Sequence, residues 1–339
     1  MLSGRAACLA KRAAVLLAAT FFSAGSSNAL SLKEAIAVAV ESNPEIGQAI
    51  ENREAIEFEL RQAKGLYLPS VDLEASTGTR KLDNATRRAL SVENDTLYPN
   101  EAGLSVTQKL FDSGARRAEV DRQASRVDGA SFRVLERSEF IALSVVQDYL
   151  EYMLQSRVVS DTAENVRFHQ SILGEIGAGI EGGALNGADR QQAQERLFAA
   201  KARNTQAVGD LEEAKIRFYK TVGLPLTNPV MPKSLASALP RTLETAIDMA
   251  RSASPSIKAA NGDVDAASAD IRAARSKYGP EVLAEAVARS GSNVDGDEGS
   301  TNDLQAMLVL RWNLYRGGID RAHEQETIRR ASEQRLKLH

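Results

Sequence analysis

An internal repeat is the feature that most constrains what this chain can fold into. Shifting the sequence by 211 positions matches residues of the N-terminal region with the same or similar residues near position 250. The matched positions are Leu32, Ala35, Ile36, Ala39, Pro44 and Ile46, which fall on Leu243, Ala246, Ile247, Ala250, Pro255 and Ile257. The shift still holds at Tyr67 and Tyr278, and a shift of 204 then matches Gly114 with Gly318. Matches in one order at nearly constant spacing indicate duplication, so we expect two copies of one structural unit.

Each repeat is predicted to open with helices. Ser31 and Glu34, three residues apart, have the spacing of a capping box that starts a helix. Pro44 should kink or restart this helix, because proline lacks the amide hydrogen that a helix interior requires. Pro69 ends the second helical run. The second helical run therefore leads directly into the strand that is expected after Pro69.

Two long β-hairpins are predicted after the helical runs. Beyond Pro69 apolar residues occupy every second position, with polar or charged residues between them. A return strand follows a polar stretch at 83–100, and the second repeat places the same strand pair around a loop at 291–302. The residues expected on the apolar side are Val71, Leu73, Leu104, Val106, Leu308 and Leu310. The charged residues expected on the opposite side include Asp72, Glu74 and Arg311.

A helical stretch from about residue 113 to residue 176 follows the first hairpin. At 1.5 Å per residue it would be on the order of 100 Å long, and part of it has coiled-coil spacing. We expect it to end in the glycine-rich segment 177–183, and Asp189 with Gln192 to cap a returning helix. Four of the nine prolines lie in 225–240, which marks a linker.

These signals divide the chain into four parts. A basic start, an apolar run of about a dozen residues and a small-residue cleavage site predict a signal peptide at 1–29. We expect a first repeat at 30–224, the linker at 225–240, and a second repeat at 241–339 that stops soon after its hairpin. Cys8 lies in the signal peptide, so the mature chain should have no disulfide and no thiolate metal site.

The alternating strands fit either a soluble sheet or a membrane barrel. A soluble sheet is the commoner setting for a single hairpin. Three features favour the membrane: strands of about ten residues, a charged face that suits a water-filled lumen, and export of the chain. Four strands cannot close a barrel, and lipid does not tolerate an open sheet edge. A sheet in the membrane therefore requires an oligomer.

The order of these motifs resembles the TolC family of outer-membrane export channels. The residues that carry the resemblance are Tyr67-Leu68-Pro69 and Leu110-Phe111-Asp112-Ser113-Gly114, echoed by Tyr278-Gly279-Pro280 and Trp312-Asn313-Leu314-Tyr315-Arg316-Gly317-Gly318. The resemblance implies an α+β membrane protein with long helical coiled-coil hairpins and two β-hairpins. Three copies would each contribute four strands to one transmembrane β-barrel, continued by helices in the periplasm. It also implies a periplasmic adaptor protein and an inner-membrane ABC or proton-driven transporter as partners.

The same resemblance implies an adaptor contact at the turn between the long helices. The residues expected to form this tip are Gly182, Gly183, Ala184, Leu185 and Asp189. Two features depart from the family pattern. Arg190 and Gln191 stand where the family usually has apolar residues, and only the residues from Ile319 onward follow the second hairpin. We therefore expect the second pair of tunnel helices to be almost wholly absent from this chain, and no gate residue is assigned.

The sequence offers little for catalysis or metal binding. His169, His323 and His339 are not at metal-ligand spacing, and no phosphate loop or nucleophile elbow is present. Asp72 and Glu74 resemble a carboxylate pair, but a lumen wall is the favoured interpretation. With a formal net charge of -3 and no polybasic face, nucleic acid is not an expected partner, and no cofactor is expected.

The leading hypothesis is a passive exit duct in the outer membrane for drugs, other toxic compounds or secreted proteins, and not an enzyme. Three alternatives stay open at this point. The first is a periplasmic coiled-coil scaffold without a barrel, the second a non-functional channel fragment, and the third an exported enzyme that uses Asp72 or Glu74.

Overall fold

The computed structural model describes residues 30–294, 296 and 298–338, in two compact units. The helical unit comprises residues 30–43 and 140–239, and the sheet unit comprises residues 44–139 and 240–338. The predicted signal peptide, Cys8 and His339 lie outside the described residues. Within the described part of the chain, no helix is both long and apolar enough to cross a membrane.

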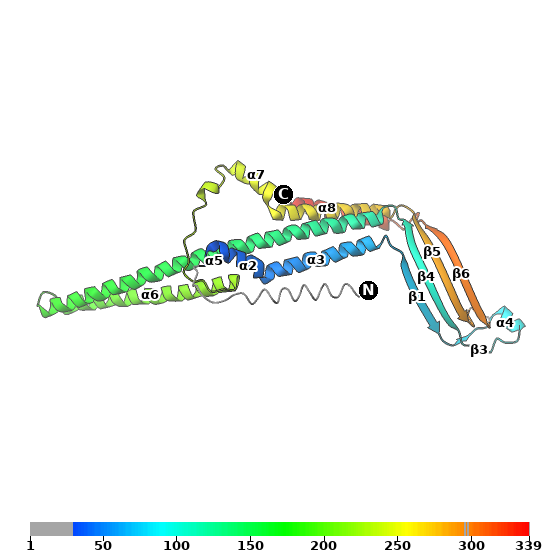
Figure 1. Ribbon diagram of the computed structural model, residues 1–339, viewed down its shortest axis with the longest axis horizontal. Helices are drawn as coiled ribbons and strands as arrows, with labels where there is room; N and C mark the ends of the chain where they lie inside the picture. The colour runs from blue at the N-terminus through cyan, green and yellow to red at the C-terminus, as the bar shows by residue number, and fades with distance from the viewer. Residues whose placement is uncertain (1–29, 295, 297, 339) are drawn as a thin grey trace. The chain divides into compact units, whose positions relative to one another are not determined.

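The sheet unit is built on one antiparallel sheet of four strands in the order β1-β4-β5-β6 (Figure 1). The strands are β1 (Ser70–Thr77), β4 (Asn100–Phe111), β5 (Glu281–Ser292) and β6 (Ser300–Arg311). Both predicted hairpins are present, because β1 pairs with β4 and β5 pairs with β6. The pairing of β4 with β5 joins the two hairpins, so strands far apart in the sequence share one sheet.

The helices of the sheet unit begin at equivalent positions in the two repeats. Helix α3 (Pro44–Gly65) and helix α8 (Pro255–Ser276) begin 211 residues apart, as do β1 and β5. Helix α5 (Ala115–Glu181) and helix α9 (Ile319–Lys337) begin 204 residues apart. The duplication seen in the sequence is thus repeated in the backbone. The predicted limits of the repeats and of the linker remain predictions.

Close helix packing in the sheet unit depends on small residues. A Cβ atom placed on Gly262 of α8 would lie 2.9 Å from the backbone of Gly129 in α5, closer than real side chains allow. Ala259, Ala266 and Ala269 of α8 are also buried. Glycine and alanine therefore let these two helices approach backbone to backbone. Helix α7 (Leu243–Ala253) precedes α8, and Pro255 begins α8 as Pro44 begins α3.

The helical unit consists of α2 (Leu32–Ser42), the remainder of α5, and α6 (Gly187–Val222), followed by a short 3-10 helix, η2 (Ala236–Ala238). The Ser31 capping box is present as predicted. Tyr149 and Phe218 are fully buried with ring centroids 6.2 Å apart. The Tyr149 hydroxyl accepts a hydrogen bond from the Val230 amide (2.8 Å) and lies 3.2 Å from the Leu30 carbonyl oxygen. This side chain therefore ties both ends of the unit to α5.

One detail of the predicted helical turn was wrong. Helix α5 ends within the glycine-rich segment, as predicted, and it continues through Gly177 and Gly179 to Glu181. A single glycine in a helix costs only about 1 kcal/mol, which a long helix tolerates. The N-cap of α6 is Asn186, and Asp189 is the third helical residue that completes its capping box. The predicted cap was therefore three residues too late, because Asn186 with Asp189 has the same capping-box spacing as Asp189 with Gln192.

The polar stretch of the first hairpin forms a small folded cap with the loop of the second. It contains β2 (Arg80–Lys81), α4 (Ala85–Ala89) and β3 (Thr96–Leu97), none of which was predicted. We call residues 80–97 together with Val294 and Gly296 the loop cap. The buried Arg87 side chain donates to the carbonyl oxygens of Val92 (2.7 Å) and Gly296 (3.2 Å). One arginine therefore joins both loops.

Candidate functional site

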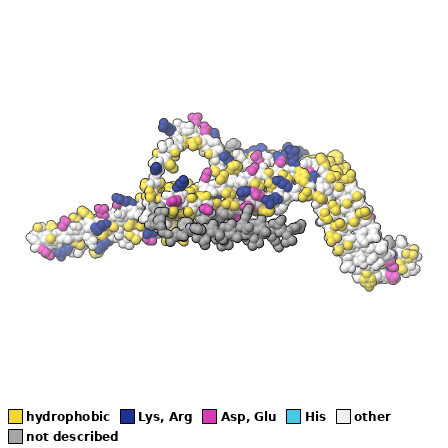
Figure 2. Space-filling view, viewed as in Figure 1, with side chains coloured by type: hydrophobic (Ala, Val, Ile, Leu, Met, Phe, Trp, Pro, Cys, Tyr) yellow, Lys and Arg dark blue, Asp and Glu magenta, His cyan; other side chains and the backbone are white. Residues whose placement is uncertain are grey.

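One face of the sheet is apolar across all four strands. The strand register places Leu73, Leu104, Ala288 and Leu304 in one row, and Val71, Val106, Ala286 and Ala306 in the next. Leu308 and Leu310 follow on the same face, opposite Ala284 and Val282. All six residues predicted for this side therefore share it, and Leu73 and Leu308 are 75% and 73% exposed. Hydrophobic side chains gather over the strands in Figure 2. We call this surface the apolar face.

The opposite face carries every charged residue of the four strands. These nine residues are Asp72, Glu74, Glu101, Lys109, Glu281, Glu285, Arg289, Asp303 and Arg311. The predicted residues Asp72, Glu74 and Arg311 are among them, as the alternation required. We call this surface the polar face. A sheet with nine charges on one face and none on the other separates two environments of very different polarity.

Ion pairs bridge neighbouring strands on the polar face. Lys109 of β4 lies 2.6 Å from Glu281 of β5, and Arg311 of β6 lies 2.9 Å from Glu285 of β5. These pairs are partly exposed, so water and salt screen them and each contributes little stability. Asp72 and Glu74 are exposed on adjacent rows of the same face. This geometry fits a hydrated wall better than an enclosed acid–base pair.

The junctions where the sheet leads into helices repeat one hydrogen bond. In the first repeat the Gln108 side-chain amide donates to the Tyr67 carbonyl oxygen (3.1 Å). In the second the Trp312 indole donates to the Tyr278 carbonyl oxygen (2.9 Å). Gln108 and Trp312 are 204 positions apart, whereas the tyrosines are 211 positions apart, as in the sequence alignment. The two repeats therefore fasten the end of a helix to a strand in the same way, with different donors.

The charges at the two junctions are reversed. Asp112 accepts hydrogen bonds from the Gly114 amide (3.2 Å) and the Arg116 amide (3.0 Å), and so caps α5. The Arg116 guanidinium also donates to Asp112 (2.8 Å). At the equivalent positions of the second repeat, Arg316 lies 3.4 Å from Asp320. The acid precedes the base at the first junction and follows it at the second.

A second contact supports the junction of the second repeat. Glu324 of α9 accepts hydrogen bonds from Arg275 (2.8 Å) and from the Tyr278 hydroxyl (3.1 Å). The hydrogen bond from Arg275, followed by that from Tyr278, lowers the pKa of Glu324 below its ordinary value of 4.5. The same carboxylate raises the pKa of Tyr278, after a larger contribution from desolvation. This carboxylate therefore anchors α9 to the end of α8.

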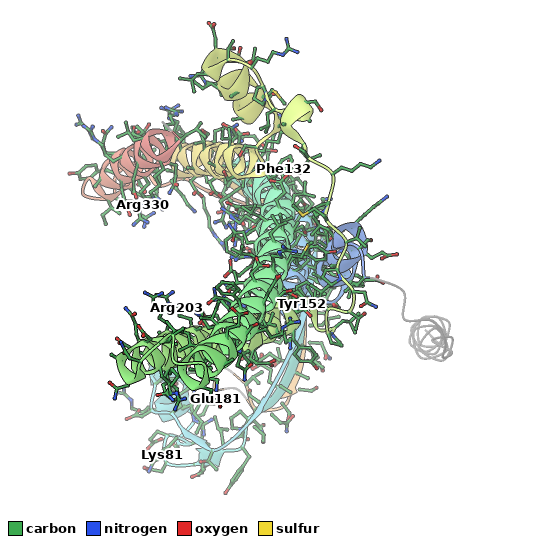
Figure 3. All side chains as sticks on the ribbon, turned by 90° about the vertical axis from the view of Figure 1, so that its left-hand side faces the viewer. Lys81, Phe132, Tyr152, Glu181, Arg203 and Arg330 are labelled. Atoms are coloured by element: carbon green, nitrogen blue, oxygen red, sulfur yellow. The ribbon has the colours of Figure 1, made fainter. Side chains whose placement is uncertain are left out.

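The turn between α5 and α6 exposes the residues predicted for the tip. Gly182, Gly183, Ala184 and Leu185 are exposed, and Gly183 has a positive φ of 76° that favours glycine. Asp189 is half-buried and accepts a hydrogen bond from the Asn186 amide (2.9 Å), so its role here is to cap α6. Figure 3 marks Glu181 at the end of α5 and Arg203 on α6, the two arms of this hairpin.

Leu185 also helps to form a groove that the sequence analysis missed. A Cβ atom on Gly179 would lie 2.7 Å from Leu185 Cδ1, so glycine lets the leucine fold back onto α5. The groove, with a volume of about 280 Å³, is lined by both helices. Its most exposed large hydrophobic side chain is Phe168, at 59%. The aromatic residue Phe168 on the long helix α5 is the sequence signal that could have indicated this groove.

The other candidate sites contain no catalytic constellation. His169 stacks edge-to-face on Phe168, and His323 lies 3.3 Å from Glu326 in the same helix. Among the described residues, no group of three histidine, cysteine or acidic side chains is placed to hold a metal ion. The surfaces that stand out are therefore the two faces of the sheet and the tip of the helical hairpin.

Comparison with known proteins agrees with this geometry. The sequence profile of a family described as outer membrane efflux protein matches residues 35–224 and 246–338. Protein CyaE of Bordetella pertussis is 28% identical over 294 residues, which cover 85% of this chain and 61% of that protein. The chain therefore spans less than two thirds of the length of this curated relative.

Solved structures share the fold. A structure of CusC, described in connection with folding and transmembrane channel formation, superposes with a TM-score of 0.77 at 15% identity. The superposition covers 94% of this chain and 75% of the CusC chain. The Campylobacter jejuni CmeC outer membrane channel gives a TM-score of 0.78 at 14% identity, covering 91% of this chain and 66% of that one. The predicted combination of long helices and two β-hairpins is therefore confirmed as the fold of these channel proteins.

Proposed function

Because the chain belongs to the outer membrane efflux protein family, we propose that it is a subunit of an outer-membrane exit duct. The family is one of efflux channels of the outer membrane and not of enzymes, which agrees with the sequence prediction. The duct would be passive and would release toxic compounds or secreted proteins. The energy for transport would come from its partners.

The observation that carries this proposal is the separation of charge between the two faces of the sheet. All nine charged residues of the four strands lie on the polar face, and the apolar face has none. A sheet between lipid and a water-filled lumen requires this distribution, because a charge facing lipid is costly. Strands β4, β5 and β6 each have 12 residues, enough for a tilted strand to cross the bilayer.

The edges of the sheet support an oligomer. Strand β1 pairs only with β4 and strand β6 only with β5 among the described strands, so the outer edge of each is open. An open edge in lipid leaves amide and carbonyl groups without partners, whereas pairing β6 of one copy with β1 of the next satisfies both. Three copies would supply twelve strands, a number within the range of known membrane barrels.

The tip of the helical hairpin is the proposed contact for a periplasmic adaptor. Gly182, Gly183, Ala184 and Leu185 form a short exposed turn, and the groove beside Leu185 and Phe168 adds apolar surface. Small residues let a partner backbone approach closely, and the groove can receive a side chain. We place an inner-membrane transporter, ABC or proton-driven, behind that adaptor.

Placing lysine on either face of β6 tests the proposal. Leu308→Lys puts a charge on the apolar face and should cost roughly 2 to 4 kcal/mol in the membrane, so little protein should reach the outer-membrane fraction as a heat-labile trimer. Met307→Lys is the matched control, because Met307 is the adjacent residue on the polar face, in register with Glu285. This variant should assemble as the unchanged chain does.

The two variants distinguish the proposal from its main alternative. Equal assembly of both variants would contradict a lipid-facing apolar face. Recovery of the unchanged chain as a monomer without detergent would favour the periplasmic coiled-coil scaffold.

A further inference from the structure

The nine charges of the polar face are not evenly distributed along the strands. Toward the hairpin ends lie four acidic residues and one basic residue, a net of three negative charges: Asp72, Glu74, Glu101 and Asp303 with Arg289. Glu74, Arg289 and Asp303 belong to one register row that crosses the whole sheet. Arg289 lies 3.2 Å from Glu101, so the single base in this region already neighbours one of the acids.

At the opposite end of the polar face the four charged strand residues cancel, and basic residues next to the strands add a positive excess. A polar pocket of about 190 Å³ lies where the strands lead into the helices. The charged residues that line it are Lys109, Lys277, Arg311 and Arg316, with Asp112 and Glu281, a net of two positive charges. The ion-pair partners just outside it are Arg116, Glu285 and Asp320, which reduce the excess to one positive charge. We call this region the basic junction.

The two regions are far enough apart to act separately. Arg311 follows Asp303 by eight positions in β6, which at about 3.3 Å per residue is a distance of about 26 Å. The Debye length is about 8 Å at physiological salt and about 10 Å at 0.1 M, both shorter than this distance. Each region therefore keeps its own sign at physiological salt. In a pore with low-dielectric walls, such fixed charges attract counter-ions into the lumen.

We propose that the polar face and the basic junction together form a two-signed channel wall, acidic toward the hairpin ends and basic where the strands lead into the helices. This inference rests on the proposed function, because it requires the polar face to line a lumen. A cargo entering from the helical end meets the basic junction first, so the wall favours molecules that carry carboxylate or phosphate groups at that step. It also makes ion flow depend on direction. One voltage polarity drives anions in through the basic end and cations in through the acidic end, which raises the ion concentration in the pore. The opposite polarity lowers the ion concentration and therefore the current.

Single-channel recording on the full chain in planar lipid bilayers tests this inference. In 0.1 M KCl the current at one voltage polarity should exceed that at the other by about twofold or more, because the Debye length of about 10 Å is shorter than the separation of the two regions and their charges still attract counter-ions. In 1 M KCl, where the Debye length is about 3 Å, the ratio should approach one. The sign of the ratio depends on which way a channel inserts, so its size is compared channel by channel.

Substitutions locate the charges responsible. The isosteric pair Glu74→Gln and Asp303→Asn removes two exposed acids from one register row and should abolish most of the asymmetry at low salt. Asn302→Ala is the control, because Asn302 adjoins Asp303 but lies on the apolar face. It should leave the current ratio unchanged.

Each result has a distinct meaning. Symmetric current at 0.1 M KCl, or asymmetry that the paired substitution does not change, would overturn the two-signed wall without contradicting the proposed exit duct. No conductance under any condition would overturn the exit duct, and this inference with it.

Discussion

The two junctions between sheet and helix contain the same ion pair in opposite directions. Before α5, Asp112 precedes the helix and Arg116 lies in its first turn. Before α9, Arg316 precedes the helix and Asp320 lies in its first turn. The first pair is buried, with side chains 9% and 10% exposed, whereas the Arg316 side chain is 43% exposed. Only the first pair can cap its helix, because a carboxylate accepts from the free amides and a guanidinium cannot.

The difference shows which features of a duplicated unit are retained. Gly114 and Gly318 occupy equivalent positions and both have positive φ, 92° and 83°. The hydrogen bonds to the carbonyl groups of Tyr67 and Tyr278 are also present in both repeats. The backbone geometry is thus preserved, while the side chains that stabilise it have changed. An acid and a base can exchange places as long as the pair remains.

The largest expected difference between the junctions comes from removing the residue before the helix. Asp112→Ala removes the cap of α5 and leaves the buried Arg116 without its carboxylate, which should destabilise the protein by about 3 kcal/mol. Arg316→Ala removes half of a more exposed pair and should cost less than about 1 kcal/mol. Urea unfolding in detergent, followed by far-ultraviolet circular dichroism, measures both. Equal costs would show that the two pairs are equivalent despite their burial.

Replacing the glycines should have a smaller effect that is the same at both junctions. Gly114→Ala and Gly318→Ala place a side chain on a residue with positive φ, at a cost of about 1 kcal/mol each. A Cβ atom would meet no neighbouring atom within 4 Å at either position, so the backbone conformation alone sets the cost. The same unfolding measurement applies. A clear difference between the two variants would contradict the backbone equivalence.

The smallest expected effect is a sensitivity to acid at the second junction. The pKa of Glu324 is lowered in the folded protein, mainly by its hydrogen bond from Arg275. Its contribution to stability is therefore present above the unfolded pKa of about 4.5 and is lost as the pH falls through the lower folded pKa. Unfolding midpoints of the unchanged chain and of Glu324→Gln should differ at pH 7 and converge once the pH falls below the folded pKa. A difference that persists at low pH would assign the effect to packing instead.

The sequence predicted the sheet well because period-two alternation determines which face each residue occupies. Val71 with Leu73, and Asp72 with Glu74, lie on the faces expected of them. The internal repeat likewise predicted that the opening helices and the β-hairpin would each occur twice. Family membership was also predicted, from the junction motifs, and the profile match confirms it.

Features that depend on contacts between distant residues were not predicted. Arg87 is buried because it reaches Gly296, which is 209 residues away in the sequence. Nothing in the local sequence distinguishes it from the exposed Arg88 beside it. The cap of α6 was misplaced for a different reason, since both Asn186 and Asp189 are suitable capping residues and only the structure shows where the helix begins.

The loop cap constrains which substitutions its two loops can accept during evolution. Surface loops of a channel usually accept substitutions independently of one another. Here a change at Arg87 removes the side chain that donates to carbonyl groups of both loops, and a change at Gly296, with its φ of 99°, displaces Leu82. Accepted substitutions in one loop must therefore be matched in the other. An antibody against the folded cap would recognise a discontinuous epitope made by two segments that lie about two hundred residues apart in the chain.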